Sequence, residues 1–243
     1  MNEYRFFCED IKKPVSELSG AEAHHLVSVL RLKAGGRVEL FDGMGTLSEA
    51  LIREIDKRKV TLEIECLQKT EPINLRRIII AVSIPKAERF DRLISKCTEL
   101  GVDRIVPVLF ERTVKRSAGS EGMARFKRIA VSACKQSGRI FLPKIDKPNN
   151  FENVLEALKA DHPSAKILVG ELGTESIPLT GLSIGDEDIV AFVGPEGGFV
   201  EEEKNLLKNC GAVPVSLTNT VLRIETAALA FASILACVRN VKK

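Results

Sequence analysis

The fold of this chain is decided by a glycine-rich stretch, Phe192-Val193-Gly194-Pro195-Glu196-Gly197-Gly198-Phe199. The apolar run Ile189 to Val193 leads into it and predicts a buried strand, whereas Glu201 to Cys210 has the pattern of a helix. Glycines at such a turn allow the backbone to approach a ligand closely. Strand, turn and helix together predict one unit of a parallel sheet.

The same alternation of apolar runs and helical patterns fills the chain after Leu75. The other strand candidates are Ile78 to Ile84, Ile105 to Phe110, Lys166 to Val169 and Val213 to Leu217. The other helix candidates are Ala87 to Leu100, Glu121 to Ser137, Phe151 to Ala160 and Thr226 to Val238. This order predicts an α/β fold with a parallel sheet covered on both faces. Ligands bind outside the carboxyl ends of such strands, so we expect the site in the loops after Val169, Val193 and Leu217.

Residues 1–70 predict a small β-rich domain, interpreted as a barrel, before a second domain at 75–243. Its strand candidates are Tyr4 to Cys8, Arg37 to Phe41, Leu47 to Ile55 and Val60 to Leu67. A helix is expected to begin at Ser19-Gly20-Ala21-Glu22, which has the spacing of a capping box, and to end before Ala34. The linker is predicted at Gln68 to Asn74.

Composition excludes several classes of protein. The chain has 243 residues, of which 44% are hydrophobic and 28% charged, and this balance argues against disorder and against a membrane protein. The longest apolar run, Thr226 to Val238, is shorter than the ~20 residues that a bilayer needs. No secretory signal is visible at the amino terminus. The six cysteines form no C-x-x-C pair, so we expect reduced thiols, no metal site and a cytoplasmic protein.

The net charge of +3 hides an uneven distribution. Residues 1–111 carry 18 basic and 18 acidic side chains, residues 112–139 carry 8 basic side chains against Glu121 alone, and residues 140–243 carry 10 basic and 14 acidic ones. On a helix, residues 121–139 would present a cationic face opposite an apolar face that includes Phe126. The cationic face consists of Arg125, Arg128, Lys135 and Arg139. Such a face is either simply solvated or binds a polyanion such as RNA.

The glycine-rich stretch does not match a phosphate-binding loop. No Lys-Ser/Thr follows it, and its spacing is not G-x-G-x-x-G. Glu196, Glu201, Glu202 and Glu203 crowd the start of the following helix, where a phosphate would need positive potential. The pattern therefore favours a ligand that is cationic or rich in hydroxyl and amine donors. The alternative is a tight turn that only permits close packing of strand and helix.

A second candidate site is Leu222-Arg223-Ile224-Glu225-Thr226-Ala227, which precedes the most apolar helix. Arg223 and Glu225 there could form a local ion pair and helix cap. Alternatively, Arg223 could stabilise a developing anion, because a guanidinium is charged at any working pH and presents several donors.

Four motifs follow one another along this chain. They are Ile94-Ser95-Lys96-Cys97-Thr98-Glu99-Leu100-Gly101-Val102, then Gln136-Ser137-Gly138-Arg139 with Pro143, then Val193 to Phe199, then Leu222 to Ala227. In order and in spacing they resemble the ribosomal RNA small subunit methyltransferase E family. His24-His25-Leu26 followed by Val29-Leu30-Arg31 resembles the family's amino-terminal domain. The resemblance runs nearly end to end.

The resemblance implies a PUA-like RNA-binding barrel followed by a SPOUT-type domain with a parallel sheet and a carboxy-terminal trefoil knot. It further implies an S-adenosylmethionine-dependent RNA methyltransferase, acting as a homodimer on N3 of a uridine in small-subunit ribosomal RNA or the assembled small subunit. A sulfonium donor is cationic and carries no phosphate, which agrees with the acidic glycine loop.

The resemblance and the patterns above together give three sets of candidate residues. For catalysis we predict anion stabilisation by Arg223 or Arg139, with Glu225 as an orienting group or a base. The predicted cofactor-binding residues are Leu168, Gly170, Gly194, Pro195, Glu196, Gly197, Gly198, Leu217, Thr218, Leu222, Arg223 and Thr226. The predicted RNA-binding residues are His24, Arg31, Arg112, Lys115, Arg116, Arg125, Arg128, Lys135 and Arg139.

The chain departs from the family pattern beside the predicted pocket. Thr218 stands where relatives usually carry a glycine, and Thr220 where they usually carry an arginine. One alternative is therefore an RNA-binding module that has lost methyl transfer. Another is a SPOUT methyltransferase that acts on a different RNA.

Overall fold

The computed structural model describes residues 4–56, 59–71, 76–113 and 120–240, and the chain forms two compact units. The first unit contains the described residues up to 71 together with residues 134–142, and the second contains the rest. The short segment 134–142 is therefore grouped with the amino-terminal unit, although it lies inside the second predicted domain. The domain boundaries at 1–70 and 75–243 stay a prediction.

The first unit is built on a five-stranded sheet. Its strands, in spatial order, are β1 (Arg5–Phe7), β3 (Arg37–Phe41), β4 (Thr46–Ile55), β5 (Lys59–Lys69) and β2 (Val15–Ser19). β1 runs parallel to β3, and the other neighbours are antiparallel. All four strand candidates are confirmed. β2 was not predicted from the sequence, because only one of its two buried side chains, Leu18, is apolar and the other is Ser16.

The helix of the first unit begins where expected but without the predicted capping box. α1 (Gly20–His24) continues into a π-helical turn, η1 (His25–Val29), and Ser19 makes no side-chain bond at its start. Glu22 is engaged elsewhere: it accepts a hydrogen bond from the backbone N–H of Phe7 at 3.1 Å and faces Lys135 Nζ at 2.9 Å. The capping-box prediction is therefore wrong, since the carboxylate has stronger partners than the helix end.

The segment 134–142 joins the first unit through backbone hydrogen bonds. The N–H of Leu142 donates to Gly43 O at 2.9 Å, and the N–H of Gly45 donates to Ile140 O at 3.3 Å. Gly138 adopts a φ of +78°, a conformation suited to glycine, directly after α3 (Ser120–Ser137) ends. The motif around Gly138 therefore has a structural role as the end of a helix and the start of a docked segment.

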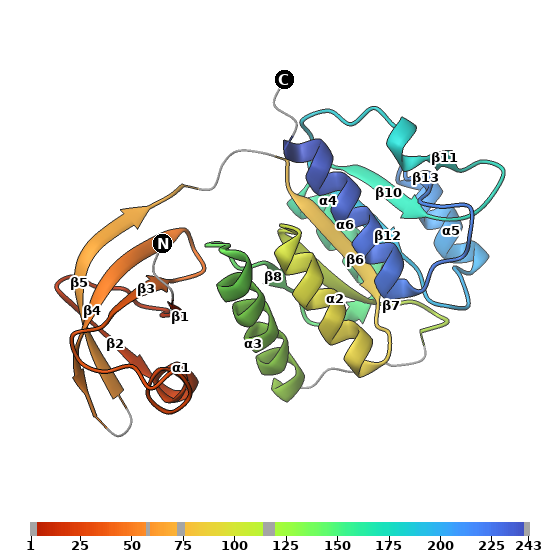
Figure 1. Cartoon of the computed structure of the whole chain (residues 1–243). Coiled ribbons are helices and arrows are strands. Elements are labelled where there is room, and N and C mark those ends of the chain that lie inside the picture. Colours follow the sequence, from red (N-terminus) through yellow and green to blue (C-terminus); the bar gives the residue numbers. More distant parts are fainter. Residues whose placement is uncertain (1–3, 57–58, 72–75, 114–119, 241–243) are drawn as a thin grey trace. The chain divides into compact units, whose positions relative to one another are not determined.

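The second unit contains a parallel sheet. Its strands, in spatial order, are β11 (Ile177–Pro178), β13 (Val213–Ser216), β10 (Lys166–Gly170), β12 (Ile189–Val193), β6 (Ile78–Ser83), β7 (Arg104–Leu109) and β8 (Lys144–Ile145), with β9 (Asn149–Asn150) also on β7. Every pairing in this sheet is parallel. The five predicted strands of this region are confirmed (Figure 1).

Helices cover both faces of this sheet, as predicted. α4 (Phe151–Asp161) and α5 (Glu201–Asn209) share a core with alternate residues of the central strands, including Ile79, Val108 and Phe192. α2 (Ala87–Glu99) and α6 (Ile224–Asn240) pack together on the other face (Figure 1). A short 3-10 helix, η2 (Leu179–Gly181), follows β11. Within the described ranges, no helix is long and apolar enough to cross a membrane.

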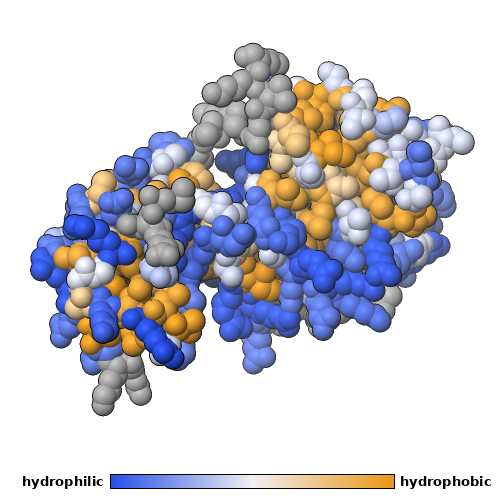
Figure 2. Space-filling model, viewed as in Figure 1, coloured by the Kyte–Doolittle hydropathy of each residue, from blue (hydrophilic) through white to orange (hydrophobic). Residues whose placement is uncertain are grey.

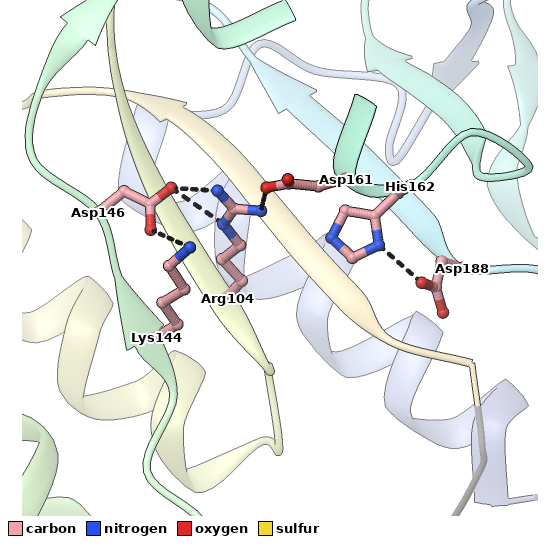
Figure 3. Close-up of polar contacts among 6 residues, drawn as sticks. All are labelled: Arg104, Lys144, Asp146, Asp161, His162 and Asp188. Atoms are coloured by element: carbon pink, nitrogen blue, oxygen red, sulfur yellow. Dashed lines mark hydrogen bonds and ion pairs between the residues drawn. The ribbon is translucent and has the colours of Figure 1, made fainter. Parts of the chain in front are cut away.

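Charged side chains at the amino ends of the parallel strands form closed pairs (Figure 3). Arg104, the first residue of β7, donates to Asp146 at 2.6 Å and to Asp161 at 2.7 Å. The Nδ1 atom of His162 lies 2.7 Å from Asp188, whose other oxygen accepts the backbone N–H of Arg77 at 2.7 Å. These contacts join β7, the segment after β8, the end of α4 and the start of β12.

Candidate functional site

A cavity of about 510 Å³ opens at the carboxyl ends of β10, β12 and β13. Its walls come from the three loops that the sequence placed there, after β10, β12 and β13, and from Arg112 in the loop after β7. Apolar side chains such as Val193, Leu222 and Ala227 line it together with backbone of the glycine-rich loop. Its volume is typical of sites for small organic ligands.

The glycines of the cavity are required by close neighbours. A Cβ atom on Gly194 would lie 2.8 Å from the ring of Phe199, and one on Gly170 would lie 2.9 Å from the ring of Phe231. Gly198 has a φ of +72°, which side chains rarely adopt. The glycines therefore permit both the turn and the approach of a ligand to the backbone.

Ten of the twelve predicted cofactor-binding residues line this cavity: Gly170, Gly194, Pro195, Glu196, Gly197, Gly198, Leu217, Thr218, Leu222 and Arg223. The other two do not. Leu168 is completely buried in β10, and Thr226 is exposed on α6. Glu171, Leu172 and Lys204 also line the wall, although they are not among the residues predicted from the sequence. Glu171 and Leu172 directly follow β10, so the rule that ligands bind after the carboxyl ends of strands could have identified them.

The glycine loop is less acidic toward the cavity than its sequence indicated. Of its four glutamates, only Glu196 lines the cavity, and it lies 4.0 Å from Arg89. Glu203 is buried and accepts the backbone N–H groups of Val200 at 3.0 Å and Glu111 at 2.9 Å. Glu201 faces Lys204 at 3.2 Å. The prediction of an acidic pocket is therefore wrong. Glu203 accepts hydrogen bonds from backbone N–H groups, and Glu201 faces a lysine of the same helix.

The residues predicted for catalysis are separated by the fold. Arg223 is exposed, lines the cavity and precedes α6, where its carbonyl accepts the N–H of Ala227 at 2.9 Å. Glu225 is buried and outside the lining; its Oε1 lies 3.7 Å from Arg89 Nε, and no described residue donates to its Oε2. Arg139 belongs to the first unit, whereas the cavity is formed by residues of the second.

Arg89 is a site residue that sequence patterns did not reveal. It lies in the first turn of α2, within ion-pair distance of both Glu196 and Glu225. It therefore links the glycine loop to the start of α6. Nothing in the spacing of these three residues along the chain signals this contact, which the tertiary fold creates.

Thr218 and Thr220 bond to each other in the loop after β13. The Oγ1 atom of Thr218 donates to Thr220 O at 2.9 Å and accepts the N–H of Thr220 at 3.3 Å. In the described part of the chain, Arg31 alone among non-glycine residues has a positive φ. Thr218 thus needs no conformation that only glycine favours, and a local side-chain turn takes the place of glycine's freedom.

The predicted cationic face of α3 is only partly available. Arg125 forms an ion pair with Asp91, and Lys135 is mostly buried against Glu22 and lies 5.1 Å above the ring of Phe6. Arg128 is exposed and has no ion-pair partner among the described residues. The apolar side of the helix agrees with the prediction, since Phe126 packs on Phe90 with ring centroids 4.9 Å apart.

The remaining predicted RNA-binding residues lie in different places. His24 and Arg31 are exposed in the first unit, and Arg31 has a φ of +53°. Arg112 lines the cavity of the second unit. Lys115 and Arg116 lie outside the described residues.

The cysteines near these elements are not poised as nucleophiles. Burial raises the pKa of Cys97 in α2 to about 12 and that of Cys134 in α3 to about 11. Both thiols therefore stay protonated at neutral pH. Among the described residues, no group of three or more His, Cys, Asp or Glu side chains could hold a metal ion.

Comparison with known families matches both parts of the chain. The model of an RNA methyltransferase domain matches residues 71–236, and that of an RNA methyltransferase PUA domain matches residues 18–65. The ribosomal RNA small subunit methyltransferase E of Synechocystis is 30% identical over 223 residues, which are 90% of this chain and 72% of the relative. That of Bacillus subtilis is 28% identical, covering 93% of each chain.

Solved structures agree over almost the whole chain. A ribosomal RNA small subunit methyltransferase E from Neisseria gonorrhoeae, bound to S-adenosyl methionine, superposes with a TM-score of 0.85 at 30% identity over 97% of each chain. A putative methyltransferase from Legionella pneumophila, in complex with the same cofactor, gives a TM-score of 0.88 at 28% identity over 98% of each chain.

Proposed function

Because this chain belongs to the ribosomal RNA small subunit methyltransferase E family, we propose that it methylates N3 of a uridine in small-subunit ribosomal RNA. The cofactor is S-adenosylmethionine, and the enzyme is an RNA methyltransferase. The observation that carries the proposal is the cavity at the carboxyl ends of β10, β12 and β13, with its glycine walls and Arg223.

The cavity has the size and chemistry for S-adenosylmethionine. Apolar side chains, including Leu217 and Leu222, can hold an adenine ring, whereas exposed backbone beside Gly170, Gly194 and Gly197 offers donors and acceptors. When bound, the cofactor supplies a methyl group carried on a positively charged sulfur. We assign its binding to the ten predicted residues that line the cavity and add Glu171 and Leu172.

Arg223 is assigned the main electrostatic role. Methylation at N3 requires that the uridine lose its N3 proton, which places negative charge on the flanking carbonyl oxygens. A guanidinium at the start of α6 stabilises that charge, aided by the positive end of the helix dipole. Arg139 is not assigned this role, because it belongs to the other compact unit.

In this proposal Glu225 is a positioning residue that holds Arg89, and it is not the base that removes the N3 proton. It is buried outside the cavity lining and its Oε1 faces Arg89, which also faces Glu196. Arg89 thereby orients the segment that carries Arg223 relative to the glycine loop. The proposal assigns removal of the N3 proton to solvent water, because Glu225 lies outside the cavity lining and Glu196 faces Arg89.

RNA contacts are assigned to both parts of the chain. We propose that residues 1–70 form the RNA-binding domain and residues 75–243 the methyltransferase domain, with the knot of its SPOUT class. His24, Arg31 and Arg128 are exposed and suited to phosphate contacts. Arg125 and Lys135 are weaker candidates, because acidic neighbours already compensate their charge. We propose the cytoplasm as the protein's site of action.

The outer side of α6 is a candidate for the homodimer interface. Leu229, Ala230 and Ile234 are only half-buried and Cys237 is exposed. Figure 2 shows apolar residues gathered on the face of the second unit where Figure 1 draws this helix. Burial of this side against a second copy would remove apolar surface from water. Sedimentation of the wild type and of Ile234→Glu tests it: a dimer that becomes monomeric is expected.

The direct test of the function is mass mapping of nucleosides. Small-subunit RNA from a strain lacking this protein, and intact small subunits from that strain, are incubated with the protein and S-adenosylmethionine. New 3-methyluridine is expected, and its absence from both substrates would refute the proposed target. Calorimetry with the cofactor alone identifies an RNA-binding module without activity, which would release no heat.

A further inference from the structure

We propose that Arg112 is a second catalytic arginine, which stabilises the anionic form of the target uridine together with Arg223; this inference rests on the function proposed above. Arg112 stands at the start of the cationic segment 112–139 and is predicted from the sequence to bind RNA. The structure places it in the lining of the cofactor cavity instead. Its role follows from how it is held and from the charges around it.

The guanidinium of Arg112 is anchored to the glycine loop. Its Nη1 donates to Gly197 O at 2.6 Å. The stem of the side chain packs over the same residue, since a Cβ atom on Gly197 would lie 3.1 Å from Arg112 Cδ. Gly197 therefore leaves room for the arginine, and the arginine is fixed against the wall of the cavity. Positioned donors of this kind need little reorganisation when charge develops.

The backbone on both sides of Arg112 is also fixed by buried groups. Before it, Glu203 accepts the N–H of Glu111 at 2.9 Å. After it, Thr113 accepts the N–H of Phe110 at 2.9 Å through Oγ1 and lies 3.1 Å from the hydroxyl of Ser83. Glu203, Thr113 and Ser83 are all buried. Residues 110–113, which follow β7, are thus a rigid support for the exposed side chain of Arg112.

The charges in the cavity lining separate into two groups. Glu196 faces Arg89, and Lys204 lies between Glu171 at 3.5 Å and Glu201 at 3.2 Å, so these charges are compensated. Arg112 and Arg223 have no carboxylate partner among the described residues. Arg112 uses one of its five N–H donors on Gly197, and within the described chain the others have no acceptor. The cavity therefore carries two cations available to an anion.

The reaction supplies such an anion. The N3–H bond of uridine breaks first and its proton goes to solvent water, leaving negative charge over N3 and the two neighbouring carbonyl oxygens. The nitrogen electron pair then forms the bond to the methyl carbon, while the sulfur–carbon bond breaks and its electron pair remains on sulfur. Because the negative charge is shared by two carbonyl oxygens, two guanidinium groups can stabilise it better than a single guanidinium can. Arg112 and Arg223 together therefore lower the cost of ionising the base before transfer.

The pH profile distinguishes this role from a structural one. Single-turnover formation of 3-methyluridine is measured from about pH 6 to pH 10, with saturating RNA and cofactor. Arg112→Ala is expected to lower the rate about 100-fold at neutral pH. The defect should shrink to less than about threefold at alkaline pH, where the base ionises without help. Arg112→Lys keeps the positive charge but loses the planar guanidinium that bonds to Gly197. Its rate at neutral pH should lie between the rates of wild type and Arg112→Ala.

Binding measurements complete the test. Calorimetry should give Arg112→Ala an S-adenosylmethionine affinity within about threefold of wild type, and Lys208→Ala, an exposed substitution on α5, should match wild type in every measurement. A defect that is equal at all pH values would show that Arg112 only shapes the loop and would overturn the inference. So would a normal rate at saturating RNA with a reduced salt dependence of binding, since Arg112 would then contact phosphate. If wild type itself forms no 3-methyluridine, the proposed function fails instead.

Discussion

A cluster of charged side chains lies at each edge of the parallel sheet, and the two clusters differ in how their arginines are paired. At the amino ends of the strands, Arg104 binds two aspartates and His162 contacts a third, so these side chains are held within the fold (Figure 3). At the carboxyl ends, Arg112 and Arg223 line a cavity without a carboxylate partner among the described residues. The arginine named at the amino edge is already paired with aspartates, whereas Arg112 and Arg223 are available to bind an anion.

In the second unit, therefore, the paired charges at the amino edge stabilise the fold, whereas the cavity arginines, which have no carboxylate partner among the described residues, are suited to the reaction. Partnered, mostly buried charges at the amino edge cost free energy when one member is removed, because the others lose their partner. Cations without a carboxylate at the cavity add little to the stability of the folded protein and are suited to charge that exists only during a reaction. Substitutions at the two edges should therefore change different measurements.

The largest effect is expected at the cavity. Arg223→Ala should slow methyl transfer about 100-fold in single turnover, since it removes the main group that stabilises the anionic base. Its thermal unfolding should match wild type, because the side chain is exposed. Arg223→Lys should recover part of the rate. Retention of the wild-type rate by Arg223→Ala would contradict the assignment of anion stabilisation to this residue.

A smaller effect, on stability, is expected at the amino edge. Arg104→Ala should lower the free energy of unfolding by about 2 kcal/mol, a value reduced from that of a fully buried pair because Asp161 is half-exposed. Arg104 also lowers the pKa of Asp161 through its hydrogen bond. This contribution is present above the ordinary carboxyl pKa and is lost as the pH falls through the lowered one. Urea unfolding should therefore show a smaller acid-dependent loss in the variant.

The matched control for Arg104 is Arg92→Ala, an exposed arginine on α2, which should leave unfolding unchanged. Equal destabilisation by the two substitutions would contradict the view that the amino edge is held by its ion pairs.

A still smaller effect, on cofactor affinity, is expected at the glycine-rich wall of the cavity. Gly194→Ala should weaken S-adenosylmethionine about tenfold, because the added Cβ would lie 2.8 Å from Phe199 and the wall must shift. Gly181→Ala serves as the control, since a Cβ there meets nothing within 4 Å. Calorimetric titration measures both. Unchanged affinity in Gly194→Ala would show that this loop does not form the cofactor wall.

The smallest effect is expected on the cationic face of α3. Arg128→Gln should reduce the slope of log affinity for RNA against log salt by about 0.9, which corresponds to one phosphate contact. Lys135→Gln should leave that slope nearly unchanged, because Glu22 already faces the ammonium group at 2.9 Å. Filter binding over a range of salt concentrations measures both. Equal slopes for wild type and Arg128→Gln would identify the face as merely solvated.

Local patterns predicted the elements of the fold well. The strand after Leu75 that leads into the glycine loop, Ile189–Val193, has the same bounds in the structure as in the sequence analysis, because a fully buried strand is apolar at every position. β2 escaped prediction because Ser16 occupies one of its buried positions. The capping box at Ser19 failed because Glu22 binds Phe7 and Lys135, which are distant in sequence.

Sequence patterns predicted the parts of the candidate site whose residues are adjacent in the chain. The glycine loop and Arg223 line the cavity because each directly follows or precedes an element that ends there. The roles of Arg89, Arg112 and Glu203 depend on contacts between elements, so no spacing reveals them. The acidic character of the loop was overestimated for the same reason: the sequence shows the carboxylates but not the groups that satisfy them.

The most direct test is to express each variant in a strain that lacks the protein and to measure 3-methyluridine in its small-subunit RNA. At a temperature where both variants are folded, Arg104→Ala should restore the modification as wild type does, whereas Arg223→Ala should leave it nearly absent. Restoration by Arg223→Ala, or its loss with folded Arg104→Ala, would contradict the assignment of chemistry to the carboxyl edge of the sheet.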